Sequence, residues 1–297
     1  MLTLSQAPSA ARSTFEGVPA VALHAGALEA VFVPGAGMAA VSLRHEGEEL
    51  LDRRAGLVAY AERGATMGIP FLHPWANRLD GWRHATPDLP RDEHGLPIHG
   101  VLPRAWDVRS MGAGELVASL DFAAAAFPFP HVAEQHVRLA PDALTITTTV
   151  RPSTSAPVPI AFGFHPYLRL PNVARSDWHI EVPVHEQLRL GPDMLPTGER
   201  VEAHVHAGRL DARTFDDAYT APEGSAPFVL AGGGRRIEVS FVDGYRYAQV
   251  FAPADDDVIA FEPMTARTNA LVDGGSDLQV LAPGETFTAT FSIAINQ

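Results

Sequence analysis

Residues 131–150 read HVAEQHVRLAPDALTITTTV and indicate the fold more directly than any other stretch of the chain. Apolar and polar residues alternate along 131–139 and along 143–150, which is the period of a half-buried β-strand. Pro141 and Asp142 lie between the two runs and are typical turn residues. The run LTITTTV at 144–150 consists almost entirely of residues that favour strands. Together with a similar run at 115–122, these residues predict an antiparallel meander.

Short runs of the same kind continue along the rest of the chain. Twenty-five glycines and 25 prolines separate them and leave little room for long helices. Further strands are predicted at 28–33, 38–43, 158–164, 178–184, 236–242, 245–252, 257–261 and 285–295. Asp243 and Gly244 join two of these runs with the spacing of a tight hairpin. The pattern predicts an all-β fold, a large antiparallel β-sandwich or barrel with little helix.

No internal repeat and no Gly- or Ser-rich linker divides the 297 residues, so we expect one domain over residues 1–297. One stretch, 64–102, has the character of a loop and is rich in Trp, His, Arg and Asn. Long loops on a β scaffold usually serve a function, because a segment of that size needs a reason to stay ordered. We therefore expect site residues in this segment.

The chain contains 22 arginines but no lysine and no cysteine. The absence of lysine excludes Schiff-base aldolases, lysine-bound pyridoxal phosphate and Walker-type phosphate loops. The absence of cysteine excludes a thiolate nucleophile, a disulfide framework and Cys-ligated zinc or iron–sulfur clusters. Any catalysis must use Asp, Glu, His, Ser, Thr, Tyr, Arg or a metal held by His and carboxylates.

Acidic residues exceed basic ones by 35 to 22, which gives a formal net charge of −13. This balance argues against nucleic acid and anionic membranes as partners. The first residues lack the basic start and apolar run of a signal peptide, and no apolar stretch is long enough to span a bilayer. We expect a cytoplasmic protein, and nothing in the sequence selects a dimer over a monomer.

Glu262 is the most informative single residue. It follows the apolar run VIAF at 258–261, so its carboxylate is expected at or near the buried end of a strand, where an unpaired charge is costly. Burial raises a carboxylate pKa, which suits a general base that works near neutral pH. The alternative is a structural ion pair with one of the arginines.

Three other residues are candidates for chemistry or binding. His165 follows the apolar run AFGF at 161–164 and could transfer a proton, although a lone histidine at a strand end is often only structural. Asn77 and Arg78 place an amide beside a planar cationic fork, which suits sugar hydroxyls or a carboxylate. The alternative for Arg78 is a surface salt bridge.

Five motifs then follow one another along the chain: PWANRLDGW (74–82), GLPIHG (95–100), FGFHPYLRLP (162–171), FDDAYT (215–220) and FEPMTARTNAL (261–271). In this order they resemble the aldose 1-epimerases, or galactose mutarotases, and the related hexose-6-phosphate mutarotases. The resemblance implies the large galactose mutarotase-like β-sandwich and an isomerase that needs no cofactor and no metal.

The resemblance also implies a role for each matching residue. Glu262 would be the general base that removes the proton of the anomeric hydroxyl, and His165 the general acid that protonates the ring oxygen. The sugar-binding residues would be Arg78 and Asn77 at ring hydroxyls, His99 near the ring oxygen, and Asp217 as an acceptor, with its neighbour Asp216 as the alternative register.

The chemistry of anomer exchange agrees with these roles. One proton must leave O1 and another must reach O5, and the reverse follows after rotation about C1–C2. A carboxylate and an imidazole on opposite sides of one sugar ring are enough for both steps. We expect a free aldose such as glucose or galactose ahead of a hexose 6-phosphate. A phosphate needs extra cations, for which Arg83, Arg169 and Arg267 are the candidates near the motifs.

Two other classes of function are alternatives. A non-catalytic sugar-binding protein would use the same fold with the acid and the base idle. A metal enzyme would use His94, His99, His165 and Glu262, although no His-x-His pair supplies two ligands from one strand. His73 precedes the first motif, where varied and often non-histidine residues are expected in galactose-specific members, so the sugar specificity is not transferred.

Overall fold

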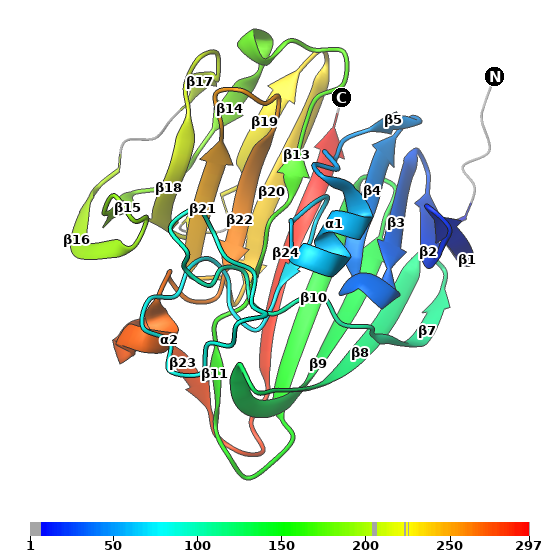
Figure 1. Cartoon of the computed structure of the whole chain (residues 1–297). Helices are drawn as coiled ribbons and strands as arrows, with labels where there is room; N and C mark the ends of the chain where they lie inside the picture. The colour runs from blue at the N-terminus through cyan, green and yellow to red at the C-terminus, as the bar shows by residue number, and fades with distance from the viewer. Residues whose placement is uncertain (1–6, 204–206, 223, 225, 297) are drawn as a thin grey trace, which may run out of the picture.

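A computed structural model describes residues 7–203, 207–222, 224 and 226–296. Strands dominate this part of the chain and gather into large antiparallel sheets with little helix (Figure 1). The predicted all-β class and antiparallel β-sandwich are confirmed.

Two large sheets and one smaller sheet contain most of the strands. The nine-stranded sheet has the order β17 (Gly208–Arg209), β14 (His179–Glu181), β19 (Phe228–Gly232), β20 (Arg235–Asp243), β24 (Phe287–Asn296), β10 (Ala143–Pro152), β9 (Phe127–Leu139), β8 (Glu115–Ala124) and β7 (Asp107–Gly112). The eight-stranded sheet has the order β16 (Pro196–Glu202), β15 (Glu186–Leu190), β18 (Phe215–Thr220), β21 (Tyr247–Ala252), β22 (Ile259–Met264), β12 (Gly163–Phe164) and β6 (Phe71–Leu72), with β13 (Tyr167–Leu168) also paired to β22.

The smaller sheet lies near the start of the chain. Its five strands follow sequence order as β1 (Ser9–Phe15), β2 (Val18–Ala25), β3 (Leu28–Val33), β4 (Ala39–His45) and β5 (Glu48–Glu49), while β11 (Val158–Ile160) and β23 (Gln279–Leu281) form a separate pair. The helical elements whose bounds lie within the described residues are α1 (Gly56–Arg63), α2 (Ala270–Asp273) and the 3₁₀ turns η1 (Pro34–Ala36), η2 (Arg175–Asp177) and η4 (Gly275–Asp277). In the part of the chain that the structure describes, no helix is long and apolar enough to cross a membrane.

The meander predicted from residues 131–150 is present. β8, β9 and β10 are consecutive neighbours in the nine-stranded sheet, and Leu139 opposes Leu144 across the turn. Burial alternates residue by residue along β10, as its sequence predicts. The last strand, β24, adds to β10, and the Thr147 and Thr290 hydroxyls hydrogen-bond across the pair at 3.0 Å. Local sequence therefore predicts the three strands β8, β9 and β10 and their order, whereas the pairing of β10 with β24 is a long-range feature.

Asp243 and Gly244 do not form the predicted hairpin. β20, which ends there, pairs with β19 and β24, whereas β21 pairs with β18 and β22 in the other large sheet. Gly244 has a φ of +75°, and a Cβ at this position would lie 2.6 Å from the backbone oxygen of Thr288. The turn therefore carries the chain from one sheet to the other, pressed against β24 where a side chain does not fit.

The main core lies between the two large sheets. Phe261 of β22 stacks on Phe228 of β19 with ring centroids 5.2 Å apart, and Phe164 of β12 contacts Phe291 of β24 at 4.8 Å. Because side chains alternate between the faces of a strand, Glu262 points away from the nine-stranded sheet. This outer face of the eight-stranded sheet is where the candidate site lies.

Segment 64–102 covers part of the same outer face. Apart from β6 it has no regular strand, and in Figure 1 its loops pass in front of β21 and β22. Leu72 and Ala76 of the segment pack in one apolar cluster with Ala218 of β18 and Met264 of β22. The isolated bridges of the segment, His73 with Gly100, Trp75 with Ala161 and Arg78 with Ile98, fix its path.

Candidate active site

Glu262 and His165 lie side by side on the outer face. Glu262 is the fourth residue of β22, inside the strand rather than at its end, and His165 directly follows β12. The His165 Nε2 and Glu262 Oε1 atoms are 3.1 Å apart, and the two residues are only 4% and 2% exposed. The two predicted proton-transfer residues are thus in direct contact. The sequence analysis expects them on opposite sides of a sugar ring, and the structure places them side by side instead.

Burial shifts the pKa values of Glu262 and His165 in opposite directions. The pKa of Glu262 is raised well above its usual value, first by burial and then by the nearby Asp216 carboxylate, while the Arg78 charge opposes this shift. The pKa of His165 is lowered well below its usual value, first by burial and then by His99. Both pKa shifts favour the uncharged forms, neutral imidazole and protonated carboxyl. In water a proton prefers the imidazole to the carboxylate, and the shifts reduce this preference.

His99 is held by the backbone of the first motif. The His99 Nδ1 accepts a hydrogen bond from the backbone N–H of Asn77 at 3.2 Å, and the backbone N–H of His99 donates to the Asn77 carbonyl at 3.1 Å. Because Nδ1 accepts, the ring proton is on Nε2, which is free to act as a donor. Burial and the Arg78 charge lower the pKa of His99 to about 3. A neutral His99 therefore lies next to His165, with ring centroids 5.8 Å apart.

Arg78 and Asn77 form the donor pair that the sequence predicts, but the two side chains also bind each other. The Asn77 Oδ1 atom accepts the Arg78 backbone N–H at 2.9 Å and its Nη1 at 3.2 Å. The Arg78 Nε donates to Asp92 at 2.6 Å, and the side chains of Arg78 and Asp92 are 9% and 2% exposed. This is a buried, fixed cation rather than the alternative surface salt bridge.

Of the two neighbouring aspartates on β18, Asp216 and not Asp217 shares the site face. Asp216 accepts a hydrogen bond from Gln249 Nε2 at 2.6 Å, and Gln249 lies opposite Glu262 in the β21–β22 register. Asp217 points to the other face and accepts a hydrogen bond from Gln187 at 2.9 Å. The structure therefore favours the alternative register, with Asp216 rather than Asp217 on the face of Glu262, because side chains alternate along β18 and only one of the two can face Glu262.

Gln249 is the site residue that the sequence analysis missed. It is 1% exposed and lies between the Asp216 and Glu262 carboxylates on the same face. Among the described residues, its Oε1 and the Glu262 Oε2 are buried without a hydrogen-bond partner. The only hint in the sequence is a polar residue inside the otherwise apolar strand YAQVFA. Strand pairing was needed to show that it faces the site.

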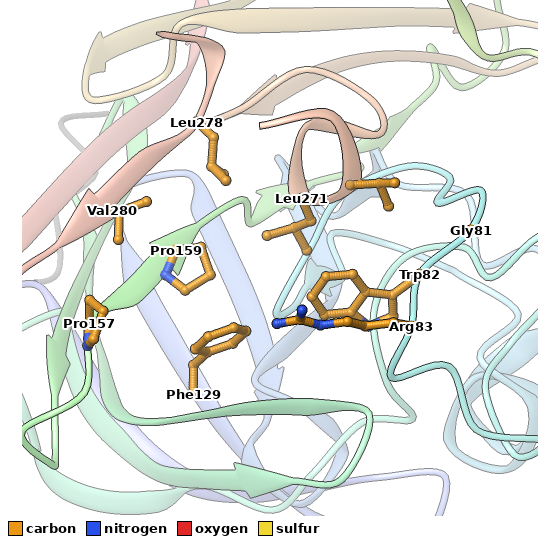
Figure 2. A pocket seen from close by; sticks show the side chains of 10 residues that line it. Gly81, Trp82, Arg83, Phe129, Pro157, Pro159, Leu271, Leu278 and Val280 are labelled. Atoms are coloured by element: carbon orange, nitrogen blue, oxygen red, sulfur yellow. The ribbon is translucent and has the colours of Figure 1, made fainter. Parts of the chain in front are cut away.

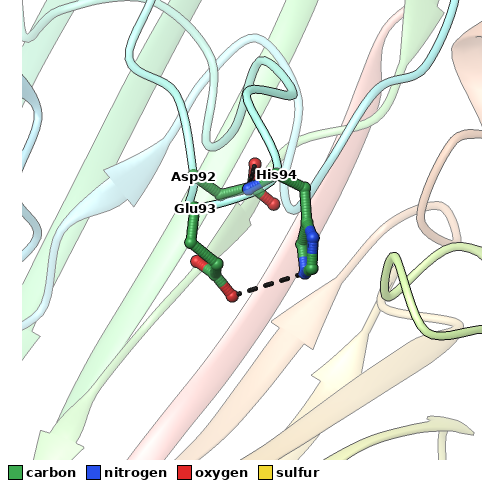
Figure 3. A group of neighbouring side chains, drawn as sticks. All are labelled: Asp92, Glu93 and His94. Carbon is green, nitrogen blue, oxygen red and sulfur yellow. Dashed lines mark hydrogen bonds and ion pairs between the residues drawn. The ribbon is translucent and has the colours of Figure 1, made fainter.

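His73 and His94, whose roles the sequence leaves open, are engaged apart from Glu262 and His165. His73 is buried, and its Nε2 hydrogen-bonds the Nε2 of His131 in β9 at 2.8 Å. His94 is exposed and lies next to Asp92 and Glu93, as Figure 3 shows. The three side chains are close enough to hold a metal ion, but Asp92 already accepts the Arg78 guanidinium and two backbone N–H groups. This cluster does not fit the predicted alternative of a metal centre built with His99, His165 and Glu262.

The two tryptophans of the first motif have other surroundings than Glu262 and His165. Trp75 is fully buried, and the Trp82 Nε1 donates to the Ala126 carbonyl at 2.8 Å. Trp82 lines a separate cavity of about 390 Å³ together with Phe129 and Leu271 (Figure 2). The walls of this cavity are mostly apolar, and it contains neither Glu262 nor His165.

The chain matches known proteins over most of its length. The sequence profile of a family described as aldose 1-epimerase matches residues 19–294. No match is found among curated proteins.

Several solved structures share the fold. A galactose mutarotase-like protein from Clostridium acetobutylicum is 18% identical with a TM-score of 0.84, over 98% of this chain and 99% of that chain. Galactose 1-epimerase from Lactobacillus acidophilus NCFM is 16% identical with a TM-score of 0.76, over 97% and 98%. A galactose mutarotase-like protein from Lactobacillus casei is 16% identical with a TM-score of 0.73, over 93% and 100%. With the profile match over 19–294, this shared architecture shows that the chain belongs to the aldose 1-epimerase family.

Proposed function

We propose that this protein is an aldose 1-epimerase that interconverts the α and β anomers of a free aldose such as glucose or galactose. The observation that carries the proposal is the buried contact of 3.1 Å between His165 Nε2 and Glu262 Oε1. A carboxylate and an imidazole at this distance can exchange protons with two neighbouring oxygens of one substrate. The O1 and O5 atoms of an aldose ring are such a pair, since both are bonded to C1.

Ring opening requires the removal of one proton from O1 and the delivery of one proton to O5. The Glu262 carboxylate takes the proton of O1, and the electrons of that O–H bond form the C1=O1 double bond. The C1–O5 bond breaks, and O5 takes its electron pair together with a proton from the protonated His165. Rotation about C1–C2 and the reverse transfers give the other anomer, without a covalent bond to the enzyme.

The pair therefore carries one proton throughout the reaction. The proton is on His165 while the ring is closed and on Glu262 while the chain is open. The opposite pKa shifts of these two groups reduce the preference for His165 that this proton has in water. The direct contact of 3.1 Å provides the path for the proton between them, which a reversible transfer requires.

The groups around the pair favour a neutral polyhydroxylated substrate. Arg78 and neutral His99 offer donors, and Asp216 and Gln249 Oε1 offer acceptors. The three arginines considered for a phosphate are less suited: Arg267 is paired with two aspartates, Arg169 lies 3.8 Å from Asp52, and Arg83 is exposed. We therefore propose a free aldose ahead of a hexose 6-phosphate.

Polarimetry tests the proposal. Freshly dissolved α-D-glucose, α-D-galactose and their 6-phosphates are followed with and without protein. Glu262→Gln and His165→Asn are each expected to lower kcat by about 10²-fold or more, because each removes one proton-transfer partner. The exposed pair His136 and Glu115, 3.5 Å apart on the nine-stranded sheet, provides the matched controls His136→Asn and Glu115→Gln. These controls should keep the full rate.

Two results would contradict the proposal. If no aldose or aldose phosphate exchanges anomers faster with protein, the protein has no such activity; saturable sugar binding without exchange would then support the sugar-binding alternative. If the Glu262 and His165 variants retain the rate of the His136 and Glu115 controls, the assignment of these two roles is wrong.

A further inference from the structure

The His165 ring is covered by Tyr167, a residue that the proposed reaction does not use. The two rings are stacked with centroids 4.0 Å apart and an interplanar angle of 15°. Tyr167 is only 6% exposed, so it packs against the imidazole rather than presenting its face for a sugar to stack on. Phe251 meets the His165 ring edge-on at 5.6 Å. The plane of the imidazole is thus defined by its aromatic neighbours.

Tyr167 is itself fixed through its side-chain hydroxyl and through its backbone. Its hydroxyl hydrogen-bonds the Thr66 hydroxyl at 2.6 Å, and its backbone N–H donates to the Gly68 carbonyl at 2.9 Å. Its carbonyl accepts the backbone N–H of Asp52 at 2.9 Å. β13, which contains Tyr167, pairs with β22 so that Tyr167 opposes Ala260, two residues before Glu262. The Tyr167 ring is therefore tied to the same strand as the other proton-transfer group.

A cation lies over the Tyr167 ring. The Arg54 guanidinium carbon is 5.3 Å from the ring centroid, and Arg54 forms an ion pair with Asp256 in the turn between β21 and β22. Arg54 has a φ of +47°, and its backbone N–H donates to Asp52 Oδ1 at 2.7 Å. A non-glycine residue in this conformation is uncommon and is held here by its surroundings. The side chain is therefore directed at Tyr167 by contacts on both sides.

We propose that Tyr167 is a positioning residue for His165, and that Thr66 and Arg54 hold its ring in the plane that the imidazole needs. The proposal rests on the proposed function only for its kinetic consequence. A proton transfer to the ring oxygen requires the imidazole N–H at a defined angle, and a small misplacement of a catalytic group lowers the rate strongly. Tyr167 transfers no proton and touches no reacting atom.

Charged and titratable groups surround the imidazole of His165 in addition to the stacked Tyr167 ring. Glu262 and His99 lie directly beside the imidazole, and Tyr167 covers its face. Burial raises the pKa of the Tyr167 hydroxyl well above neutral pH, so it stays protonated. The Arg54 charge contributes to the lowered pKa of His165. Removal of this charge should raise that pKa, because a nearby positive charge disfavours the imidazolium.

Tyr167→Phe and Tyr167→Leu separate the ring from its hydroxyl. Phe keeps the stack and loses the Thr66 hydrogen bond, so kcat is expected to fall less than about 10-fold. Leu removes the stack, and kcat is expected to fall by about 10²-fold with KM changed less than about 3-fold. Circular dichroism and the melting temperature establish that both variants are folded. A change in KM alone, or full kcat in a folded Leu variant, would overturn the proposal.

A spectroscopic readout keeps this test independent of activity. A ring stacked at 4.0 Å shifts the His165 ring protons upfield in the NMR spectrum, and these signals are assigned by their absence in His165→Asn. We expect the shift to persist in Tyr167→Phe and to disappear in Tyr167→Leu. If the wild-type protein exchanges no anomers but shows this pattern, the proposed function fails while the placement of His165 by Tyr167 stands. An unchanged His165 signal in the Leu variant would overturn that placement.

Arg54→Gln and Arg53→Gln form a matched pair for the cation. Arg53 is the chain neighbour of Arg54, but its guanidinium lies over Phe15 and pairs with Glu49. We expect the limb of the kcat–pH profile that reports His165 to move to higher pH in Arg54→Gln and to stay in place in Arg53→Gln. Equal profiles for the two variants would remove Arg54 from the proposal.

Discussion

Asp216 and Asp217 are chain neighbours with different surroundings, and only Asp216 shares a face of the sheet with Glu262. Asp216 faces Gln249 and Glu262, and its pKa is raised, first by burial. Asp217 faces Gln187 on the side of the sheet that carries the core. At the scale of single residues, the site is therefore selected by the face of the strand as much as by residue type.

Asp216→Asn is expected to raise KM by about 10-fold, because the amide is a weaker acceptor for a sugar hydroxyl and part of it is a donor. It should also lower the pKa of Glu262, since the Asp216 charge is one cause of the raised value. The kcat–pH profile would then shift to lower pH on its Glu262 limb. Steady-state polarimetry across pH measures both effects.

Asp217→Asn is the matched control for that experiment. It changes the same functional group one residue away, and KM and the pH profile are expected to stay near wild type. If Asp217→Asn raises KM and Asp216→Asn does not, β18 presents the other aspartate to the sugar and the corrected assignment is wrong.

Residue types and their local context indicated Glu262, His165, Asn77 and Arg78, the family resemblance added His99, and the structure brings these five residues together. A charged group directly after an apolar strand needs a reason, and that signal is local. The contact between His165 and Glu262 could not be predicted in the same way. β12 and β22 are neighbours in the sheet, but the strands from β13 to β21 lie between them along the chain. The face of Asp216 could not be predicted either, because it depends on strand register.

At the scale of elements, Gly100 fixes the loop that carries His99. Its φ is +86°, and a Cβ would lie 1.9 Å from the carbonyl oxygen of His73. The loop closes here on the first motif, where the Val101 N–H donates to the same carbonyl at 3.1 Å. The close approach of the two backbones leaves no room for a side chain.

We expect Gly100→Ala to lower the free energy of unfolding by more than about 3 kcal/mol, because the backbones must separate as well as accept a strained conformation. Gly95→Ala, in the same loop, should cost only about 1 kcal/mol. Gly95 also has a positive φ of 77°, but no atom lies within 4 Å of its added Cβ. Urea unfolding compares the two, and an equal loss would mean that the close approach is easily relieved.

The elements themselves show what local sequence can predict. Alternation located β3 and β10 almost to the residue, and the short turn at Pro141-Asp142 indicated β9 as one neighbour of β10, whereas its other neighbour, β24, comes from the end of the chain. The run at 158–164 is divided between β11 and β12, and Asp243-Gly244 joins two sheets instead of two neighbouring strands. A turn sequence specifies a change of direction, but long-range packing decides which sheet the next strand enters.

At the scale of the whole molecule, the surroundings of four of the described histidines disfavour protonation. His73, His99, His131 and His165 all have lowered pKa values, with burial as the first cause in each. The unfolded chain binds a proton at each near pH 6.5, whereas the folded protein does so only at lower pH. Above about pH 6.5 these histidines are neutral in both states and do not lower the free energy of unfolding. Below that pH the unfolded chain binds more protons than the folded protein, and the free energy of unfolding decreases.

We expect the free energy of unfolding to decrease from pH 7.5 to pH 5.5, with each histidine adding up to about 1.4 kcal/mol per pH unit. Glu262 opposes the trend, because its raised pKa makes the folded state the stronger proton binder. The double variant His73→Leu/His131→Leu removes both partners of the buried 2.8 Å hydrogen bond and should flatten the slope. Urea titrations at several pH values measure it, and His136→Asn serves as the exposed control. A slope unchanged by the double variant would contradict the assignment.

β22 serves two purposes within six residues: Phe261 packs in the core, and Glu262 belongs to the site. Mutations that retune the chemistry and mutations that disturb folding therefore fall on interleaved positions rather than in separate regions. The outward positions are also packed, because Ala218 of β18 and Met264 of β22 share an apolar cluster with Leu72 and Ala76. A substitution on this face that alters the surroundings of Glu262 is therefore expected to change stability as well as chemistry.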